Sequence, residues 1–112
     1  MITEKEHATL TESSLGELKL AGQVDYRNGK YLSEVGRSII NQSKATAFTL
    51  DCSCVTRTSS VGVSLILSLI REAKQTGRTL TIKALTTDLE EIAKFSDLKD
   101  VLPLSADYQV IG

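Results

Sequence analysis

The chain has 112 residues, of which 41% are hydrophobic and 24% charged, and this is ordinary globular composition. Its length suits one hydrophobic core, so we expect a single domain over residues 1–112. The formal net charge of −1 offers no overall attraction to nucleic acid or anionic lipid, and the longest apolar stretch is far short of the roughly 20 residues that span a bilayer.

The N-terminal part predicts a β-hairpin. Residues 1–10 lack the basic-then-apolar order of a secretory signal, so we expect the chain to stay in the cytoplasm. A short strand is predicted over residues 8–11, followed by a polar turn at residues 12–14. Leu18 and Leu20 then alternate with charged residues, which predicts a half-buried strand that ends at Gly22.

The next segments predict a loop, a helix and a strand. Residues 25–29 form a polar loop, with Asn28-Gly29 as its strongest turn signal. An amphipathic helix that ends near residue 41 or 42 is indicated by apolar residues at helical spacing: Leu32, Val35, Ile39 and Ile40. Residues 45–50 are typical of a strand, which Asp51 is expected to close.

The second half of the chain continues this alternation. A second helix is predicted over residues 60–76, with Gly77 as a left-handed cap, and a strand follows over residues 79–84. Thr86, Thr87 and Asp88 can cap a short helix, and Pro103 limits a last strand at residues 101–104 to the edge of the sheet. This order of elements predicts an α/β fold with a mixed sheet.

The second helix has a broad apolar surface. One stripe is expected to pack on the sheet: Val63, Ile66, Leu67, Ile70 and Ala73. Beside it, Val61, Leu65 and Leu69 form a second apolar set, part of which is either exposed for contact with another protein or covered by neighbouring helices. A stripe of small and polar side chains also runs along the helix: Ser60, Ser64, Ser68, Arg71 and Gln75. These serines either let another backbone approach closely or are simply solvated.

The start of this helix is rich in hydroxyl groups, from Thr56, Thr58, Ser59 and Ser60. A hydroxyl at an N-cap accepts a hydrogen bond from an unpaired backbone N–H, and one of the four is enough for that role. A phosphate at this place would also be favoured by the helix dipole. Capping and regulation by phosphate are both compatible with the sequence.

The sequence offers little for catalysis. Its only histidine is His7, and no glycine-rich phosphate loop is present. Asp25 and Asp51 could meet at one end of the sheet, but acidic residues at strand ends are commonly solvated loop residues or caps. Cys52 and Cys54 are too close for a comfortable disulfide and lack partners for a metal site, so reduced thiols are expected. We expect a protein that is not an enzyme and that needs neither cofactor nor metal.

Three segments together resemble the STAS family, which includes the anti-anti-sigma factors: residues 18–25, residues 48–51 (Phe-Thr-Leu-Asp) and residues 58–62 (Thr-Ser-Ser-Val-Gly). The resemblance covers nearly the whole chain and implies the STAS fold, a mixed sheet with helices packed against it. In anti-anti-sigma factors a serine at the start of this helix is phosphorylated by a partner kinase. That serine falls on Ser60, so the resemblance implies Ser60, with Ser59, as a candidate phosphorylation site.

Further segments resemble the MlaB group of this family, the STAS subunits of phospholipid ABC transporters that maintain outer-membrane lipid asymmetry: residues 67–77, 91–95 and 100–103. This resemblance implies an ABC-transporter ATPase as the partner and a location at the inner membrane through that partner. It places the contact at Ser60, Val61, Ser64, Leu65 and Ser68. The alternative is an anti-anti-sigma factor that binds an anti-sigma kinase, and an exposed Leu65 and Leu69 would serve a homodimer equally well.

Overall fold

The computed structural model describes residues 8–112, and His7 lies outside them. The described part contains five strands: β1 (Ala8–Ser14), β2 (Glu17–Val24), β3 (Ala47–Thr58), β4 (Thr79–Thr86) and β5 (Leu104–Ile111). The three α-helices are α1 (Gly29–Gln42), α2 (Ser60–Gln75) and α3 (Thr87–Phe95), and a short 3₁₀ helix spans Lys99–Val101. All three predicted helices are therefore confirmed.

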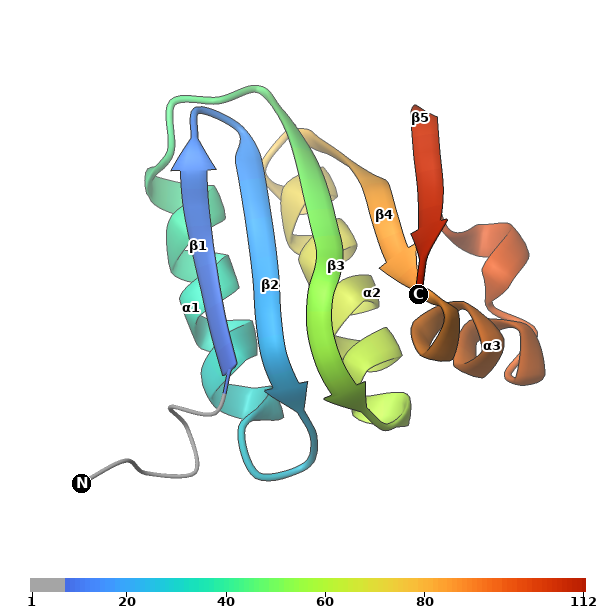
Figure 1. Cartoon of the computed structure of the whole chain (residues 1–112). Helices are drawn as coiled ribbons and strands as arrows, with labels where there is room; N and C mark the ends of the chain where they lie inside the picture. Colours follow the sequence, from blue (N-terminus) through green and yellow to red (C-terminus); the bar gives the residue numbers. More distant parts are fainter. Residues whose placement is uncertain (1–7) are drawn as a thin grey trace.

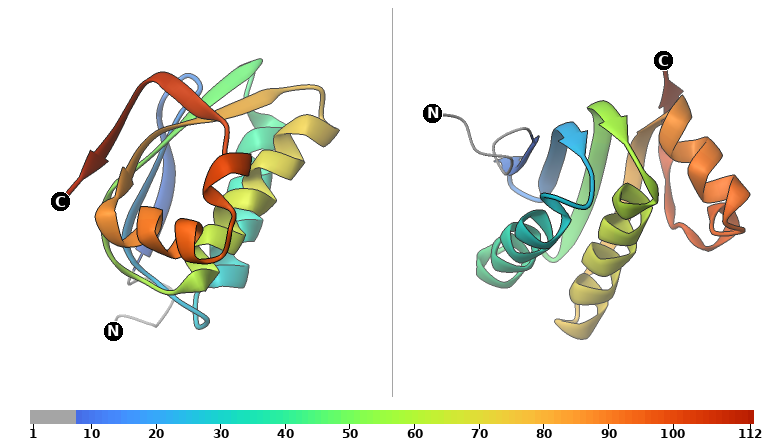
Figure 2. Two further views of the ribbon diagram at one scale, coloured as in Figure 1. Left: turned by 90° about the vertical axis from the view of Figure 1, so that its right-hand side faces the viewer. Right: turned by 90° about the horizontal axis from the view of Figure 1, so that it is seen from below.

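The strands form one mixed sheet in the order β1-β2-β3-β4-β5 (Figure 1). β1 and β2 pair antiparallel as the predicted hairpin, and the other neighbours pair parallel. α1 and α2 lie side by side against one face of the sheet, and α3 follows on the side of β4 (Figure 2). The predicted α/β fold with a mixed sheet is confirmed. Among residues 8–112, no helix has both the length and the apolar character needed to cross a membrane.

The core fills the space between the sheet and the helices. Its largest fully buried side chains include Leu20, Phe48, Leu50 and Ile82 from the sheet, Leu32 and Ile40 from α1, and Ile66 and Leu69 from α2. On α2, Val63, Ile66, Ile70 and Ala73 of the predicted stripe are buried, whereas Leu67 is half-buried. The periodicity of the sequence thus identified the face of α2 that packs on the sheet.

The hairpin turn lies later than predicted. Residues 12–14 belong to β1, and the chain reverses at Leu15-Gly16, where Gly16 has φ +81°. A Cβ on Gly16 would lie 2.6 Å from the carbonyl oxygen of Ala47, so glycine is required there by both backbone conformation and space. The predicted end of β2 at Gly22 is also wrong. Gly22, with φ +95°, lies at an irregularity in the register with β3, and β2 continues to Val24.

β3 is longer than predicted and is not closed by Asp51. Between the pairs Lys19–Asp51 and Ala21–Cys54, β3 contains one more residue than β2, which is a β-bulge. The extra residue reverses the alternation of faces, so Cys52 lies in the core while Cys54 is exposed. Burial raises the pKa of the Cys52 thiol. Because alternation is the sequence signal for a strand, the bulge concealed the second half of β3.

The last strand also differs from the prediction. The 3₁₀ helix extends to Val101, where the last strand was predicted to begin, and β5 begins only after Pro103. The carbonyl oxygen of Pro103 accepts a hydrogen bond from the backbone N–H of Ile82 at 2.7 Å. β5 lies at the edge of the sheet, as expected for a strand that follows proline.

Candidate functional site

The β2–α1 loop and the start of α2 meet at one end of the sheet (Figure 1). The last residues of two parallel strands, Val24 of β2 and Thr58 of β3, are register partners. The backbone N–H of Ser59 donates to the carbonyl oxygen of Val24 at 3.3 Å. Parallel strands therefore bring the two segments, which are far apart in the sequence, to one surface.

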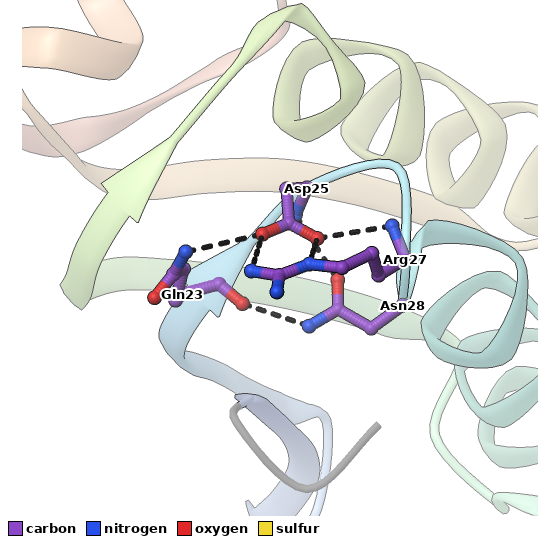
Figure 3. Close-up of polar contacts among 4 residues, drawn as sticks. All are labelled: Gln23, Asp25, Arg27 and Asn28. Atoms are coloured by element: carbon purple, nitrogen blue, oxygen red, sulfur yellow. Dashed lines mark hydrogen bonds and ion pairs between the residues drawn. The ribbon is translucent and has the colours of Figure 1, made fainter. Parts of the chain in front are cut away.

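A hydrogen-bonded network centred on Asp25 shapes the β2–α1 loop (Figure 3). Arg27 donates from Nη2 to Asp25 Oδ2 at 2.7 Å and from Nε to Oδ1 at 3.2 Å. The backbone N–H of Arg27 and the side chain of Gln23 also donate to this carboxylate, at 3.0 and 3.1 Å. These donors, the Arg27 side chain foremost, lower the pKa of Asp25 to about 2.

Asn28 completes the loop from the buried side. The residue is 1% exposed, and its side chain donates to the carbonyl oxygen of Gln23 at 2.8 Å and accepts from the backbone N–H of Asp25 at 3.1 Å. The loop is thus held by its own side chains, and it presents Tyr26, which is 83% exposed, to solvent. A surface of this kind is preorganised, because binding a partner would require little further ordering of the loop.

The low pKa of Asp25 predicts a pH effect on stability. Its pKa is lowered by folding, so its contribution is complete above the unfolded value of about 4 and is lost as the pH falls through about 2. The Asp25→Asn variant should therefore be less stable than the wild type at pH 7. Its stability should also fall less than that of the wild type as the pH is lowered toward 2. Urea unfolding midpoints of both proteins from pH 7 to pH 2 would measure it. A difference between the two midpoints that stays constant over this range would contradict the prediction.

The hydroxyl groups at the start of α2 make different contacts. Ser59 is the N-cap, and its Oγ accepts from the backbone N–H of Val61 at 3.2 Å. Thr58 Oγ1 donates to the carbonyl oxygen of Ser59 at 3.0 Å. Ser60 is the first residue of the helix and is exposed, and its hydroxyl has no hydrogen-bond partner within residues 8–112. Capping is thus performed by Ser59, which leaves the Ser60 hydroxyl accessible.

Gly62 allows β3, α2 and α3 to approach closely at this end. A Cβ at Gly62 would lie 2.2 Å from Thr58 Oγ1 and 3.0 Å from Leu89 Cδ2. In the sequence, Gly62 stands out only as the last residue of the segment Thr58-Ser-Ser-Val-Gly62. The structure supplies a physical reason for glycine at this position.

A shallow groove of about 360 Å³ runs between the first turns of α1 and α2. Its lining comes from the loop and both helices: Tyr26, Gly29, Lys30, Ser33, Val61, Ser64, Leu65 and Ser68. Four of the five predicted contact residues thus share one groove, and Ser60 lies outside its lining. Small residues let the helices approach, since a Cβ on Gly29 would lie 2.6 Å from Val61 Cγ1 and the hydroxyls of Ser33 and Ser68 are 3.1 Å apart.

Of the two alternatives for Leu65 and Leu69, exposure to a partner or cover by neighbouring helices, the structure shows the second. The two side chains are only 4% and 1% exposed, because α1 packs alongside α2 and covers them. Gly36 of α1 makes this possible, since a Cβ there would lie 2.2 Å from Leu69 Cδ2. Leu65 therefore forms the floor of the groove, and the two leucines offer no apolar surface for a homodimer.

The two acidic residues considered for catalysis do not meet. Asp51 lies within β3, opposite Lys19 of β2, whereas Asp25 follows the end of β2, where Val24 pairs with Thr58. Among residues 8–112, no three side chains of the kinds that ligate metals gather at one place.

The contribution of α1 to the groove was not predicted from the sequence. Tyr26, Gly29, Lys30 and Ser33 lie in a segment that the sequence described only as a polar loop and the start of an amphipathic helix. A hydrophobic aromatic residue in a polar loop was the one signal that could have drawn attention to it. Nothing in the sequence indicated that this segment lies beside α2.

Comparison with known proteins identifies the fold and the family. The family model described as Mlab, STAS domain, matches residues 8–104. The unphosphorylated anti-sigma factor antagonist SpoIIAA is a similar solved structure, with a TM-score of 0.65 and 15% identity over 94% of this chain and 88% of that chain. The phosphorylated form of SpoIIAA, the Bacillus cell fate determinant, has a TM-score of 0.58 and 16% identity over 94% of this chain and 91% of that chain.

A third similar chain occurs in the structure of the diguanylate cyclase SiaD in complex with its activator SiaC from Pseudomonas aeruginosa. It has a TM-score of 0.61 and 12% identity over 97% of this chain and 94% of that chain. At these identities the solved structures establish a common fold, and the predicted fold class is confirmed.

Proposed function

The chain belongs to the STAS domain family of the MlaB type, and from this premise we propose that it is a non-catalytic subunit that binds and regulates the ATPase of an ABC-type phospholipid transporter. The single observation that carries this proposal is the match of the MlaB-type family model to residues 8–104. The transporter is of the kind that maintains the lipid asymmetry of the outer membrane. The subunit would remain in the cytoplasm and reach the inner membrane only through the ATPase.

The α1–α2 groove and the adjacent Ser60 are the proposed contact with the ATPase. Val61 and Leu65 supply an apolar floor, and the small side chains of Ser64 and Ser68 leave room for a partner's backbone or side chain. Tyr26 stands at the rim as a large exposed aromatic residue, a residue type that is enriched at protein interfaces.

Regulation follows if the subunit binds one conformation of the ATPase more tightly than another. A ligand shifts a conformational equilibrium only by its difference in affinity for the two states. A rigid groove is suited to such discrimination, because it cannot adapt equally well to both. In this mechanism the bound subunit contributes contacts, and ATP hydrolysis belongs to the partner.

The proposal is tested by affinity capture from the source cells with the tagged chain, followed by mass spectrometry. The wild type should recover an ABC-transporter ATPase, and Ser64→Arg should reduce its recovery by about tenfold or more, because the long charged side chain blocks the groove. Gln75→Arg is the matched control, since Gln75 is exposed at the other end of the same helix. Failure of the wild type to recover such an ATPase would contradict the proposal, as would equal recovery with Ser64→Arg.

A second candidate is an anti-anti-sigma factor that binds an anti-sigma kinase. It is favoured by the exposed Ser60 hydroxyl and by the similar fold of SpoIIAA in both its phosphorylated and unphosphorylated forms. Phosphate at Ser60, or at Ser59, would add negative charge at the contact surface. The same captured material discriminates the two, since recovery of a serine kinase and a phosphorylated peptide containing Ser59 and Ser60 would favour this alternative.

A further inference from the structure

One face of α3 is apolar and acidic: Asp88, Glu91 and Phe95 are exposed, and Ile92 is partly buried against the core. Asp88, Glu91, Ile92 and Phe95 are spaced at i, i+3, i+4 and i+7, so they share one side of the helix. With Thr58 they line a hollow of about 270 Å³. Phe95 is 94% exposed, more than any other large hydrophobic residue in the described part of the chain. We refer to these four α3 residues as the α3 face.

On the opposite side of α3, Glu90 contacts Lys94 of the same helix, Lys99 of the 3₁₀ helix and Tyr108 of β5. Glu90 Oε2 accepts from the hydroxyl of Tyr108 at 2.8 Å and lies 3.5 Å from Lys99 Nζ, and Lys94 Nζ lies 3.2 Å from Glu90 Oε1. The hydrogen bond from Tyr108 lowers the pKa of Glu90. This arrangement fixes the rotation of α3 about its axis, so the outward position of Phe95 follows from the packing of the helix.

The two carboxylates of the α3 face have no ion-pair partner in the described part of the chain. Asp88 and Glu91 are the only charged residues in the lining of the hollow, and neither forms an ion pair among residues 8–112. The α1–α2 groove has the opposite character, since Lys30 is the only charged residue in its lining. The two hollows thus present opposite charges beside apolar surface.

The hollow at the α3 face borders the start of α2. Thr58, which contributes to its lining, is followed directly by the N-cap Ser59 and by Ser60. α3 packs against α2, and the views in Figures 1 and 2 place it at the end of the molecule where α2 begins. A protein bound at the α1–α2 groove and Ser60 can therefore reach the α3 face without crossing an intervening element.

We propose that the partner bound at the α1–α2 groove also contacts the α3 face, through an apolar side chain flanked by lysine or arginine. The apolar group covers Phe95 and Ile92, and the cations pair with Asp88 and Glu91. This inference rests on the proposed function, because it specifies the chemistry of the same partner. Such a contact would account for an exposed Phe95 beside two carboxylates, Asp88 and Glu91, that form no ion pair among residues 8–112.

The test uses the full chain and the purified ATPase subunit identified by the capture experiment. Phe95→Ala and Glu91→Lys should each weaken binding by about tenfold, the change expected when an interface anchor is removed. Glu91→Lys should also reduce the dependence of affinity on salt, because an attractive charge pair is lost. Both residues are exposed, so the variants should fold normally, which thermal unfolding would verify.

The matched controls are Leu15→Ala and Glu17→Lys. Both residues are exposed and belong to the β1–β2 hairpin, whose turn is at the opposite end of the sheet (Figure 1). Unchanged binding by the controls and weaker binding by the α3 variants would support the inference. Unchanged affinity and salt dependence in the α3 variants would overturn it and leave the proposed function intact. If no ATPase is recovered, the proposed function fails and this inference fails with it.

Discussion

Leu65→Asp should destabilise the protein by about 3–5 kcal/mol, which approaches the whole stability of many small domains. Leu65 is 4% exposed beneath α1, so the substitution would place a carboxylate in the core without a partner. Burial disfavours the charged form and should raise the pKa of the new carboxyl group. The destabilisation should therefore be smallest below about pH 4 and increase as the pH rises through the raised pKa.

Urea unfolding of the wild type and Leu65→Asp between pH 3 and pH 7 measures this effect. Ser64→Asp is the matched control, because Ser64 is the preceding residue but is exposed, and it should change stability by less than about 0.5 kcal/mol. Equal stability of Leu65→Asp and Ser64→Asp at pH 7 would show that Leu65 is not buried. The comparison also explains why Ser64 is the better position for testing partner binding.

Leu69→Ala should destabilise the protein by about 2–5 kcal/mol, the usual cost of truncating a buried leucine. Leu69 is 1% exposed and contacts α1 at Gly36. Gly36→Ala should also destabilise, by about 1–3 kcal/mol, since its Cβ would lie 2.2 Å from Leu69 Cδ2 and 2.9 Å from Leu10 Cδ2. These two substitutions act on the same contact.

The double variant is therefore expected to lose less stability than the sum of the single variants. Leu69→Ala removes the atom that clashes with a Cβ at Gly36, and it leaves space that the added methyl group can partly fill. Chemical unfolding of all four proteins gives the coupling energy. Simple additivity would mean that α1 and α2 do not pack at Gly36 as described.

The α1–α2 contact links stability to the proposed function. The groove exists because α1 lies close enough to α2 for Gly29, Ser33 and Gly36 to meet Val61, Ser68 and Leu69. A substitution that separates the helices should widen the groove even where the protein remains folded. Partner binding by Gly36→Ala is therefore expected to fall along with its stability.

Local sequence signals predicted all three helices, the hairpin and the face of α2 that packs on the sheet. Helical spacing and capping residues act within a few positions of each other, so they can be read directly from the chain. The hydroxyl-rich start of α2 was likewise recognised, although the sequence could not assign capping to Ser59 and leave Ser60 exposed. That assignment depends on the exact residue at which the helix begins.

Strand boundaries were predicted less well, for an identifiable reason. In β3 a bulge reverses the alternation of buried and exposed residues between Cys52 and Cys54, so the pattern that marks a strand is interrupted. In the hairpin, the turn is decided by Gly16, whose close approach to Ala47 joins segments about thirty residues apart. Neither feature is a property of neighbouring residues.

The amino-acid sequence was sufficient to predict an α/β domain with a mixed sheet, and it indicated the first half of α2 as the surface of interest. The tertiary structure was needed to show that Leu65 and Leu69 are covered, that Tyr26 and Lys30 share a groove with Ser64, and that Phe95 is exposed. The physical reason is that periodicity reports how apolar a helix face is, whereas exposure depends on which other element packs against it. Here α1 covers one side of α2, whereas no element within residues 8–112 covers Phe95 at the end of α3.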